Sequence, residues 1–246
     1  MSEMEAEMEH IAEQTYTKKV WVVVSSALLK VLERPTVERL GGKYLRMGDY
    51  HWRIYYHPHK KSMYQRHVNH VVDFFSDKGG TLLDVGCGDG LILSRLGSET
   101  ELDCFGIDIS PLAIALAHQH KVMNCQCIDL FEYAENNFDY VFVGDLLEHL
   151  PDPELALNCI KNFLADGGYA LIAVPIQGQI PDGGDRYIVN LRKLMHLSRR
   201  VFGTIVCLQV RRTWKKWYVL ARKRVRGDAE IMKSDEAMKE NTQVIE

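Results

Sequence analysis

Apolar and polar positions along residues 81–174 alternate between the two spacings that are typical of strands and helices. Short apolar runs predict strands at 81–85, 102–107, 122–128, 138–143 and 169–174. Helical spacing predicts helices over Asp89–Leu96, Pro111–His120 and Pro153–Leu164. Ser110 is placed to cap the second helix, and Gly167 with Gly168 is expected to end the third. This alternation predicts a parallel sheet with helices on both faces.

The pattern changes after Pro175. Residues 177–185 are rich in Gly, Pro and Asp and predict a loop, and Tyr187–Phe202 has helical spacing. Two strand-like runs, 204–210 and 216–222, then predict an antiparallel hairpin on the sheet edge. The expected fold class is therefore α/β, as a Rossmann-like, doubly wound, mostly parallel seven-stranded sheet. It carries a C-terminal antiparallel hairpin and an N-terminal helical extension.

The length of 246 residues suits one α/β domain with extensions. Residues 1–14 contain five glutamates without Lys or Arg and are expected to be disordered, as is the polar tail 227–246. Between them we expect a helical and aromatic lid segment, 15–78, and the main domain, 79–226. With six cysteines and no secretory signal, a cytoplasmic location with free thiols is expected. The apolar stretch 20–32 is too short to span a membrane.

A glycine-rich loop directly follows the first expected strand, in the run Leu82–Gly90 (LLDVGCGDG). Closely spaced glycines let a ligand approach the backbone and the start of the next helix. A dinucleotide-binding loop would have the spacing G-x-G-x-x-G, and its last glycine would fall on Leu91. The loop therefore predicts a ligand site and disfavours an NAD dehydrogenase of the same fold.

Three further segments place polar groups where the next strands end. Asp108 ends the second strand, where its carboxylate can accept hydrogen bonds from a ribose diol. Asp129 and Leu130 end the third strand, where they can contact an adenine amine and ring nitrogen. The fourth strand leads into the polar run 144–151 (GDLLEHLP). Because open α/β sheets bind ligands at this edge, the segments together indicate a ligand that contains adenosine.

These segments, in this order over Gly79–Pro175, resemble class I S-adenosylmethionine-dependent methyltransferases. The runs 144–153 and 164–168 are most similar to the small-molecule branch that includes the ubiquinone-biosynthesis O-methyltransferases. The resemblance implies S-adenosyl-L-methionine as cofactor and methyl transfer to a small-molecule acceptor, with O-methylation expected. It implies that the ribose is bound by Asp108 beside Ile109, and the adenine by Asp129 and Leu130. The methionine part is then expected to contact Asp84, Gly86, Cys87, Gly88 and Gly90. The amine and the sulfonium are expected to contact Gly144, Asp145 and Leu146.

Direct methyl transfer from a sulfonium requires close positioning and often a base. His149, preceded by Glu148, is the candidate general base, because histidine titrates near neutral pH. The alternative is that this pair only closes the turn after the fourth strand. No resident metal is expected. A variant hypothesis reads Asp145, Glu148 and His149 as ligands of a divalent metal that lowers the pKa of a substrate hydroxyl.

Two other segments leave open questions. Tyr50, Trp52, Tyr55 and Tyr56 are candidates for a lid that contacts the acceptor, and ordinary packing is the alternative. The basic stretch 199–226 is either a solvated edge hairpin or a surface for an anionic partner. An RNA-directed methyltransferase and a catalytically silent cofactor-binding scaffold therefore remain as alternatives. The net charge of −3 gives no global preference for nucleic acid, and a monomer or homodimer is expected.

Overall fold

The computed structural model describes residues 48–56, 63–176, 191–211 and 216–224. The sequence predictions for 1–47, 57–62, 177–190 and 225–246 lie outside these ranges. The strands are β1 (Gly79–Val85), β2 (Glu101–Asp108), β3 (Cys125–Cys127), β4 (Phe138–Gly144), β5 (Leu164–Pro175), β6 (Gly203–Arg211) and β7 (Lys216–Lys223). The helices are α4 (Tyr50–Tyr55), α5 (Met63–Phe75), α6 (Leu91–Glu99), α7 (Pro111–Gln119), the 3-10 helix η1 (Leu147–His149), α8 (Pro153–Phe163) and α9 (Leu191–Phe202).

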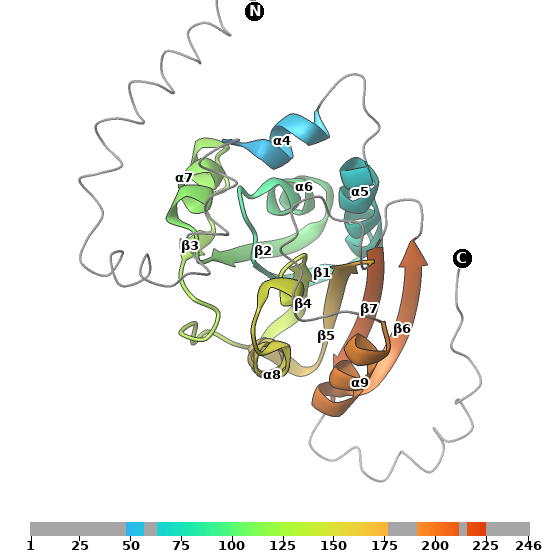
Figure 1. Cartoon of the computed structure of the whole chain (residues 1–246). Coiled ribbons are helices and arrows are strands. Elements are labelled where there is room, and N and C mark those ends of the chain that lie inside the picture. The colour runs from blue at the N-terminus through green and yellow to red at the C-terminus, as the bar shows by residue number, and fades with distance from the viewer. Residues whose placement is uncertain (1–47, 57–62, 177–190, 212–215, 225–246) are drawn as a thin grey trace, which may run out of the picture. The chain divides into compact units, whose positions relative to one another are not determined.

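The seven strands form one sheet in the order β3-β2-β1-β4-β5-β7-β6 (Figure 1). β1 to β5 pair in parallel, whereas β7 is antiparallel to both β5 and β6. The strand order reverses between β1 and β4. From β1 the chain continues to β2 and β3 on one side, and from β4 it continues to β5 on the other side. In a doubly wound sheet, the crevice at the carboxyl ends of such strands is the usual ligand site. The predicted fold class is confirmed.

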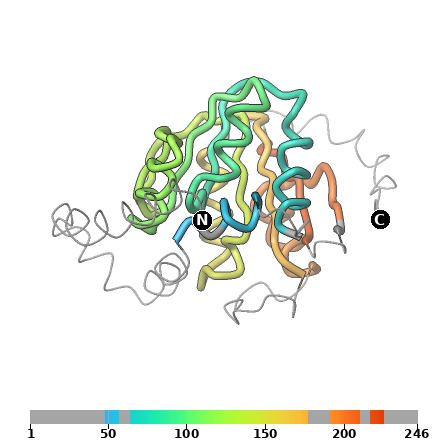
Figure 2. The backbone as a smooth tube through the Cα atoms, turned by 90° about the horizontal axis from the view of Figure 1, so that it is seen from above, coloured from blue at the N-terminus to red at the C-terminus, as the bar shows by residue number. Residues whose placement is uncertain are grey.

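Alternate residues of each central strand contact helices on opposite faces of the sheet. Leu83 and Val85 pack with residues of α8 and α9, and Leu82 packs with residues of α5 and α6. Figure 1 shows α5, α6 and α7 on one side of the sheet and α8 and α9 on the other, and Figure 2 shows the same body turned by 90°. Burial on both faces explains why these parallel strands are apolar almost throughout.

The start of α7 is as the sequence predicts. The Ser110 side chain accepts a hydrogen bond from the backbone N–H of Ala113, and Pro111 occupies the first turn. The third predicted strand is shorter than expected, because only Cys125–Cys127 pairs with β2. The helix predicted over 187–202 is described from Leu191 onward.

The expected end of α8 at Gly167 and Gly168 is wrong. The helix ends at Phe163, and Leu164 already has an extended conformation that begins β5. The glycine pair therefore lies inside the strand, beside the register shift between Phe138 and Tyr140 of β4. A Cβ on Gly168 would lie 3.0 Å from two backbone oxygens, so this glycine permits close strand packing and does not cap a helix.

Among the described residues, no helix is long and apolar enough to cross a membrane.

Candidate active site

The glycine loop after β1 has the backbone conformation that its sequence predicts. Gly86, Gly88 and Gly90 all have positive φ, at 82°, 59° and 77°. Residues with a Cβ adopt this region at a cost, so the loop follows a path that favours glycine. A Cβ on Gly86 would lie 3.3 Å from the side chain of Leu146, which follows β4. The loop and the end of β4, separated by sixty residues in sequence (146 − 86), thus come together.

Asp108 connects the glycine loop to the end of β2. Its Oδ2 accepts a hydrogen bond of 2.9 Å from the backbone N–H of Gly88, and its Oδ1 accepts one of 2.8 Å from Ser110. A carboxylate accepts hydrogen bonds at both oxygens, which is the chemistry that a ribose diol requires of its partner. The Ser110 side chain caps α7 as predicted, and Asp108 in addition binds the Ser110 backbone N–H.

The third and fourth segments complete the edge. The backbone N–H of Ile128 donates to the Asp108 carbonyl at 3.0 Å, which brings the end of β3 beside β2. Asp129 Oδ1 accepts from the N–H of Phe131 at 3.0 Å, and Leu130 is buried next to it. Ile109 is half-buried between these acids. All four sequence segments therefore meet along the carboxyl ends of β3, β2, β1 and β4.

Asp84 is the deeply buried acid of this edge, with 2% of its surface exposed. Burial, together with the nearby Asp108 carboxylate, raises the pKa of Asp84 from 3.8 to about 8. A buried carboxyl group of this kind favours a cationic partner, because a positive charge would stabilise its ionised form. An amino acid ammonium group is a fitting partner at this position.

The Asp84 carboxyl should make stability depend on pH. Its folded-state pKa lies above 3.8, so the unfolded chain releases this proton first as pH rises. We expect Asp84 to stabilise the ligand-free fold below about pH 4 and to lose that contribution progressively as pH rises to about 8. Urea unfolding of wild type and Asp84→Asn at about pH 5 and pH 8 should show the variant gaining relative stability at the higher pH.

The same substitution at Asp103, which is exposed on β2, is the matched control for that measurement. Parallel pH dependences of wild type and Asp84→Asn would contradict the assignment.

The 3-10 helix η1 directly follows the polar end of β4. Glu148 is fully buried, and Nε2 of His149 lies 3.9 Å from its Oε1, with 18% of the His149 side chain exposed. Asp145 has a positive φ of 53° and forms an ion pair with Lys216 of β7. The described residues contain no group of three or more His, Cys, Asp or Glu side chains that could hold a metal ion. The structure therefore does not assemble Asp145, Glu148 and His149 into the hypothesised metal site.

Helix α4 lies against the glycine loop through Asp89, a residue that the sequence analysis did not single out. Asp89 accepts hydrogen bonds from the backbone and the ring Nδ1 of His51, at 3.1 and 2.9 Å, and from the Trp52 indole at 2.8 Å. Trp52 also stacks on His120 of the α7 end at 3.9 Å. Tyr55 is buried, whereas Tyr56 is largely exposed, and Tyr50 begins the helix. Within the aromatic segment, His51 and Trp52 thus contact the loop directly.

The described basic residues of the stretch 199–226 mostly contact this chain itself. Arg200 pairs with Glu154 at 2.6 Å, and Lys223 lies 3.6 Å from Asp166. Arg222 donates to the Gly167 carbonyl, and Arg224 to the Gly203 carbonyl. These contacts favour the interpretation of the stretch as a structured edge hairpin.

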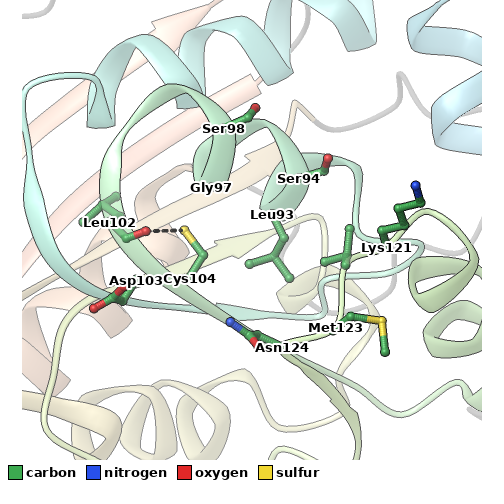
Figure 3. Close-up of a pocket in the computed structure, with 11 residues that line it drawn as sticks. Leu93, Ser94, Gly97, Ser98, Leu102, Asp103, Cys104, Lys121, Met123 and Asn124 are labelled. Carbon is green, nitrogen blue, oxygen red and sulfur yellow. Dashed lines mark hydrogen bonds between the residues drawn. The ribbon is translucent and has the colours of Figure 1, made fainter.

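A separate open cavity lies near the amino end of β2, between α6 and the connection from α7 to β3 (Figure 3). Its lining includes Ser94 and Gly97 of α6, Cys104 of β2, and Lys121 and Asn124 of the connection. Since Asp108 stands at the other end of β2, this cavity is not the site formed by the four segments.

The methyltransferase-domain family matches this chain over residues 59–221. The match covers β1 to β5 with the glycine loop, and most of the hairpin. The chain belongs to this family. With the doubly wound sheet and the glycine loop in place, it contains a class I methyltransferase domain, for which S-adenosyl-L-methionine is the cofactor. The predicted family, enzyme class and cofactor are confirmed.

Similar curated proteins match part of this methyltransferase. Phosphoethanolamine N-methyltransferase 2 of Caenorhabditis elegans is 32% identical over 114 residues, which is 42% of this chain and 26% of the relative. Ubiquinone biosynthesis O-methyltransferase of Pseudomonas paraeruginosa is 30% identical over 114 residues, 43% of this chain and 49% of the relative. The matched region thus spans half or less of these relatives.

Solved structures share the fold at lower sequence identity. N-methyltransferase NodS from Bradyrhizobium japonicum, in complex with S-adenosyl-L-homocysteine, aligns with a TM-score of 0.62 at 18% identity, covering 77% of this chain and 99% of that chain. Magnesium protoporphyrin IX methyltransferase from Synechocystis aligns with a TM-score of 0.61 at 17% identity, covering 77% and 98%. These similarities support the architecture alone.

Proposed function

We propose that this methyltransferase transfers the methyl group of S-adenosylmethionine to an oxygen of a small-molecule acceptor. The convergence of four ligand-type segments on one sheet edge carries the proposal, because it brings the residues that we assign to the adenosine close to the end of β4. The likeness to ubiquinone biosynthesis O-methyltransferases favours a hydroxyl acceptor. The domain is expected to span 79–226, with the N-terminal segment 15–78 as a lid.

Each segment is assigned one part of the cofactor. The positive-φ glycines with Cys87 leave backbone open to the methionine part, and the buried Asp84 faces its ammonium group. Asp108 beside Ile109 accepts from the ribose hydroxyls, and Asp129 with Leu130 contacts the adenine. The run Gly144–Leu146 lies next to the sulfonium. When bound, S-adenosylmethionine supplies an electrophilic methyl group, and the chain supplies orientation and exclusion of water.

His149 is assigned as the group that accepts the proton of the acceptor hydroxyl. It stands directly after β4, partly exposed, in front of the buried Glu148 carboxylate. A nearby carboxylate stabilises an imidazolium, so Glu148 supports this role by its charge. Neither group needs to form a covalent intermediate.

Replacing His149 by Ala should lower kcat by about a hundredfold or more, as expected for loss of a general base. The dissociation constant of S-adenosylmethionine should stay near the wild-type value, because the assigned cofactor contacts lie on other segments. A methyl-transfer assay with S-adenosylhomocysteine release as readout, run beside calorimetry, checks both. The exposed His118 of α7, replaced by Ala, is the control. An unchanged kcat in His149→Ala would mean that Glu148 and His149 only close the turn after β4.

The proposal as a whole is tested by calorimetry with S-adenosylmethionine and S-adenosylhomocysteine, followed by a screen of catechols, phenols and primary amines as acceptors. Binding of both cofactor forms with turnover of a hydroxyl compound supports it. Turnover of amines alone would overturn the oxygen assignment. Turnover of RNA, with binding that falls steeply as salt rises, would overturn the small-molecule assignment.

A further inference from the structure

A row of histidine and aromatic rings connects the glycine loop with the end of β4. It begins at His51, which binds Asp89 of the loop, and continues to Tyr64, whose ring stacks on His51 with centroids 5.1 Å apart. Tyr64 lies 6.1 Å from His67, which in turn contacts Phe142 of β4 and Tyr218 of β7. The row therefore borders the edge at which the proposed cofactor segments meet.

His67 is the buried polar member of this row. It shares the apolar face of α5 with Val68, Val71 and Phe75, and only 2% of its surface is exposed. Its Nδ1 forms a 2.7 Å hydrogen bond with the Tyr218 hydroxyl. A buried imidazole is costly unless its polar atoms have partners, and Tyr218 satisfies only one of its two nitrogens.

The second nitrogen, Nε2, faces the end of β4. It lies 3.7 Å from the point at which a Cβ of Gly144 would stand. No described residue forms a hydrogen bond with Nε2. Gly144 begins the run that we assign to the sulfonium, and its own neighbour Asp145 pairs with Lys216. Nε2 is thus directed to the part of the edge where the acceptor must meet the methyl group.

Burial, with the charge of Lys216, keeps the His67 ring neutral. Burial, and then the Lys216 ammonium, lower the pKa of His67 to about 3, although Asp145 acts in the opposite direction and His70 and His51 add smaller repulsions. A ring that stays neutral at physiological pH is a weak proton acceptor. It remains a good hydrogen-bonding group, so its chemistry differs from that assigned to His149.

We propose that His67 is the acceptor-positioning residue: its Nδ1–H donates to Tyr218, and its Nε2 accepts a hydrogen bond from a second O–H or N–H of the acceptor, beside the hydroxyl whose proton His149 accepts. This inference rests on the proposed function and adds a specificity element to it. An acceptor held this way presents its reacting oxygen to the methyl group, and a compound with no second O–H or N–H beside that oxygen lacks the required hydrogen. Tyr218 fixes the ring, so the site is complete only when β7 is paired.

The test uses sinefungin, a cofactor analogue in which an amino-bearing carbon replaces the methylated sulfonium. Its amino group supplies the N–H donor that an acceptor would supply. The test therefore does not require the natural acceptor to be known. S-adenosylhomocysteine, which has no group at that position, is the reference ligand. The measured quantity is the ratio of the two dissociation constants by calorimetry in the full-length chain.

Four variants separate the proposed contact from simple core packing. His67→Asn keeps a polar atom near the position of Nδ1 and loses Nε2, whereas His67→Gln keeps one near Nε2. We expect His67→Asn to weaken the binding of sinefungin by about tenfold relative to that of S-adenosylhomocysteine, as for a lost hydrogen bond to a charged group. His67→Gln should keep the ratio of the two dissociation constants near the wild-type value. The ratio of dissociation constants in Tyr218→Phe should lie between the ratios of the two His67 variants. His70→Asn, which alters another ring that contacts Tyr218, is the control.

Equal weakening of both ligands in His67→Asn, or an unchanged ratio, would overturn the inference and leave His67 a core residue. A change in the ratio of dissociation constants that is as large in His67→Gln as in His67→Asn would also overturn the inference. If wild type binds neither ligand, the proposed function fails first. Thermal unfolding of each variant shows whether the fold is retained.

Discussion

Arginine in place of Gly86 should abolish binding of S-adenosylmethionine, with a loss of at least about a hundredfold in affinity, or about 2.7 kcal/mol. Gly86 has a φ of 82°, and its Cβ position is 3.3 Å from Leu146, so a side chain there is strained and fills the approach to the backbone. A long cationic side chain would also oppose the sulfonium and ammonium charges of the cofactor. Calorimetry with S-adenosylmethionine measures the loss.

The matched control is Gly97→Arg in α6, because Gly97 has nothing within 4 Å of its Cβ position. Both variants should keep wild-type helix and strand content by circular dichroism, since Gly86 lies in a loop at the sheet edge. Normal cofactor affinity in Gly86→Arg would mean that the loop does not hold the cofactor, and the assigned site would be wrong.

The second large effect is expected from Asp108→Ala, which should weaken cofactor binding by about a hundredfold to a thousandfold. Hydrogen bonds to a charged group contribute about 1.5–3 kcal/mol each, and two ribose hydroxyls would lose their acceptor. The change also leaves the N–H groups of Gly88 and Ser110 without the carboxylate that holds the loop to α7. Both effects act in the same direction.

Asp108→Asn separates these contributions, because it keeps one acceptor oxygen without the charge. Its affinity should lie between those of wild type and Asp108→Ala. Asp103→Ala, at an exposed position toward the other end of the same strand, should bind normally. Affinity in Asp108→Ala within about threefold of wild type would exclude a ribose contact of the stated strength.

The fold was readable from the sequence because each central strand is buried on both faces. Continuous apolar runs such as Val141–Val143, ending in polar residues, admit few other structures. The glycine loop was equally readable, since Gly86, Gly88 and Gly90 occupy conformations that other residues avoid. Local sequence thus determined the elements and the edge at which they end.

The parts that escaped prediction depend on contacts between residues distant in sequence. His67 and Tyr218 are 151 positions apart, and each alone resembles an ordinary residue on an apolar face. The ion pair of Asp145 with Lys216 likewise depends on the order of β5 and β7 in the sheet. The helix end predicted at Gly167 and Gly168 was wrong for a local reason. Glycines are common both at helix ends and at close strand contacts, and the sequence alone does not distinguish the two.

The last strand that the structure describes along the chain, β7, is an interior strand of the sheet, since it lies between β5 and β6. A nascent chain that has emerged from the ribosome only as far as β6 therefore exposes the β5 edge, where unpaired backbone groups invite aggregation. Tyr218 arrives with that strand, so His67 has its partner only after translation of the domain is nearly complete. Premature stop codons before β7 should consequently yield chains that chaperones retain and proteases remove, rather than enzymes of reduced activity.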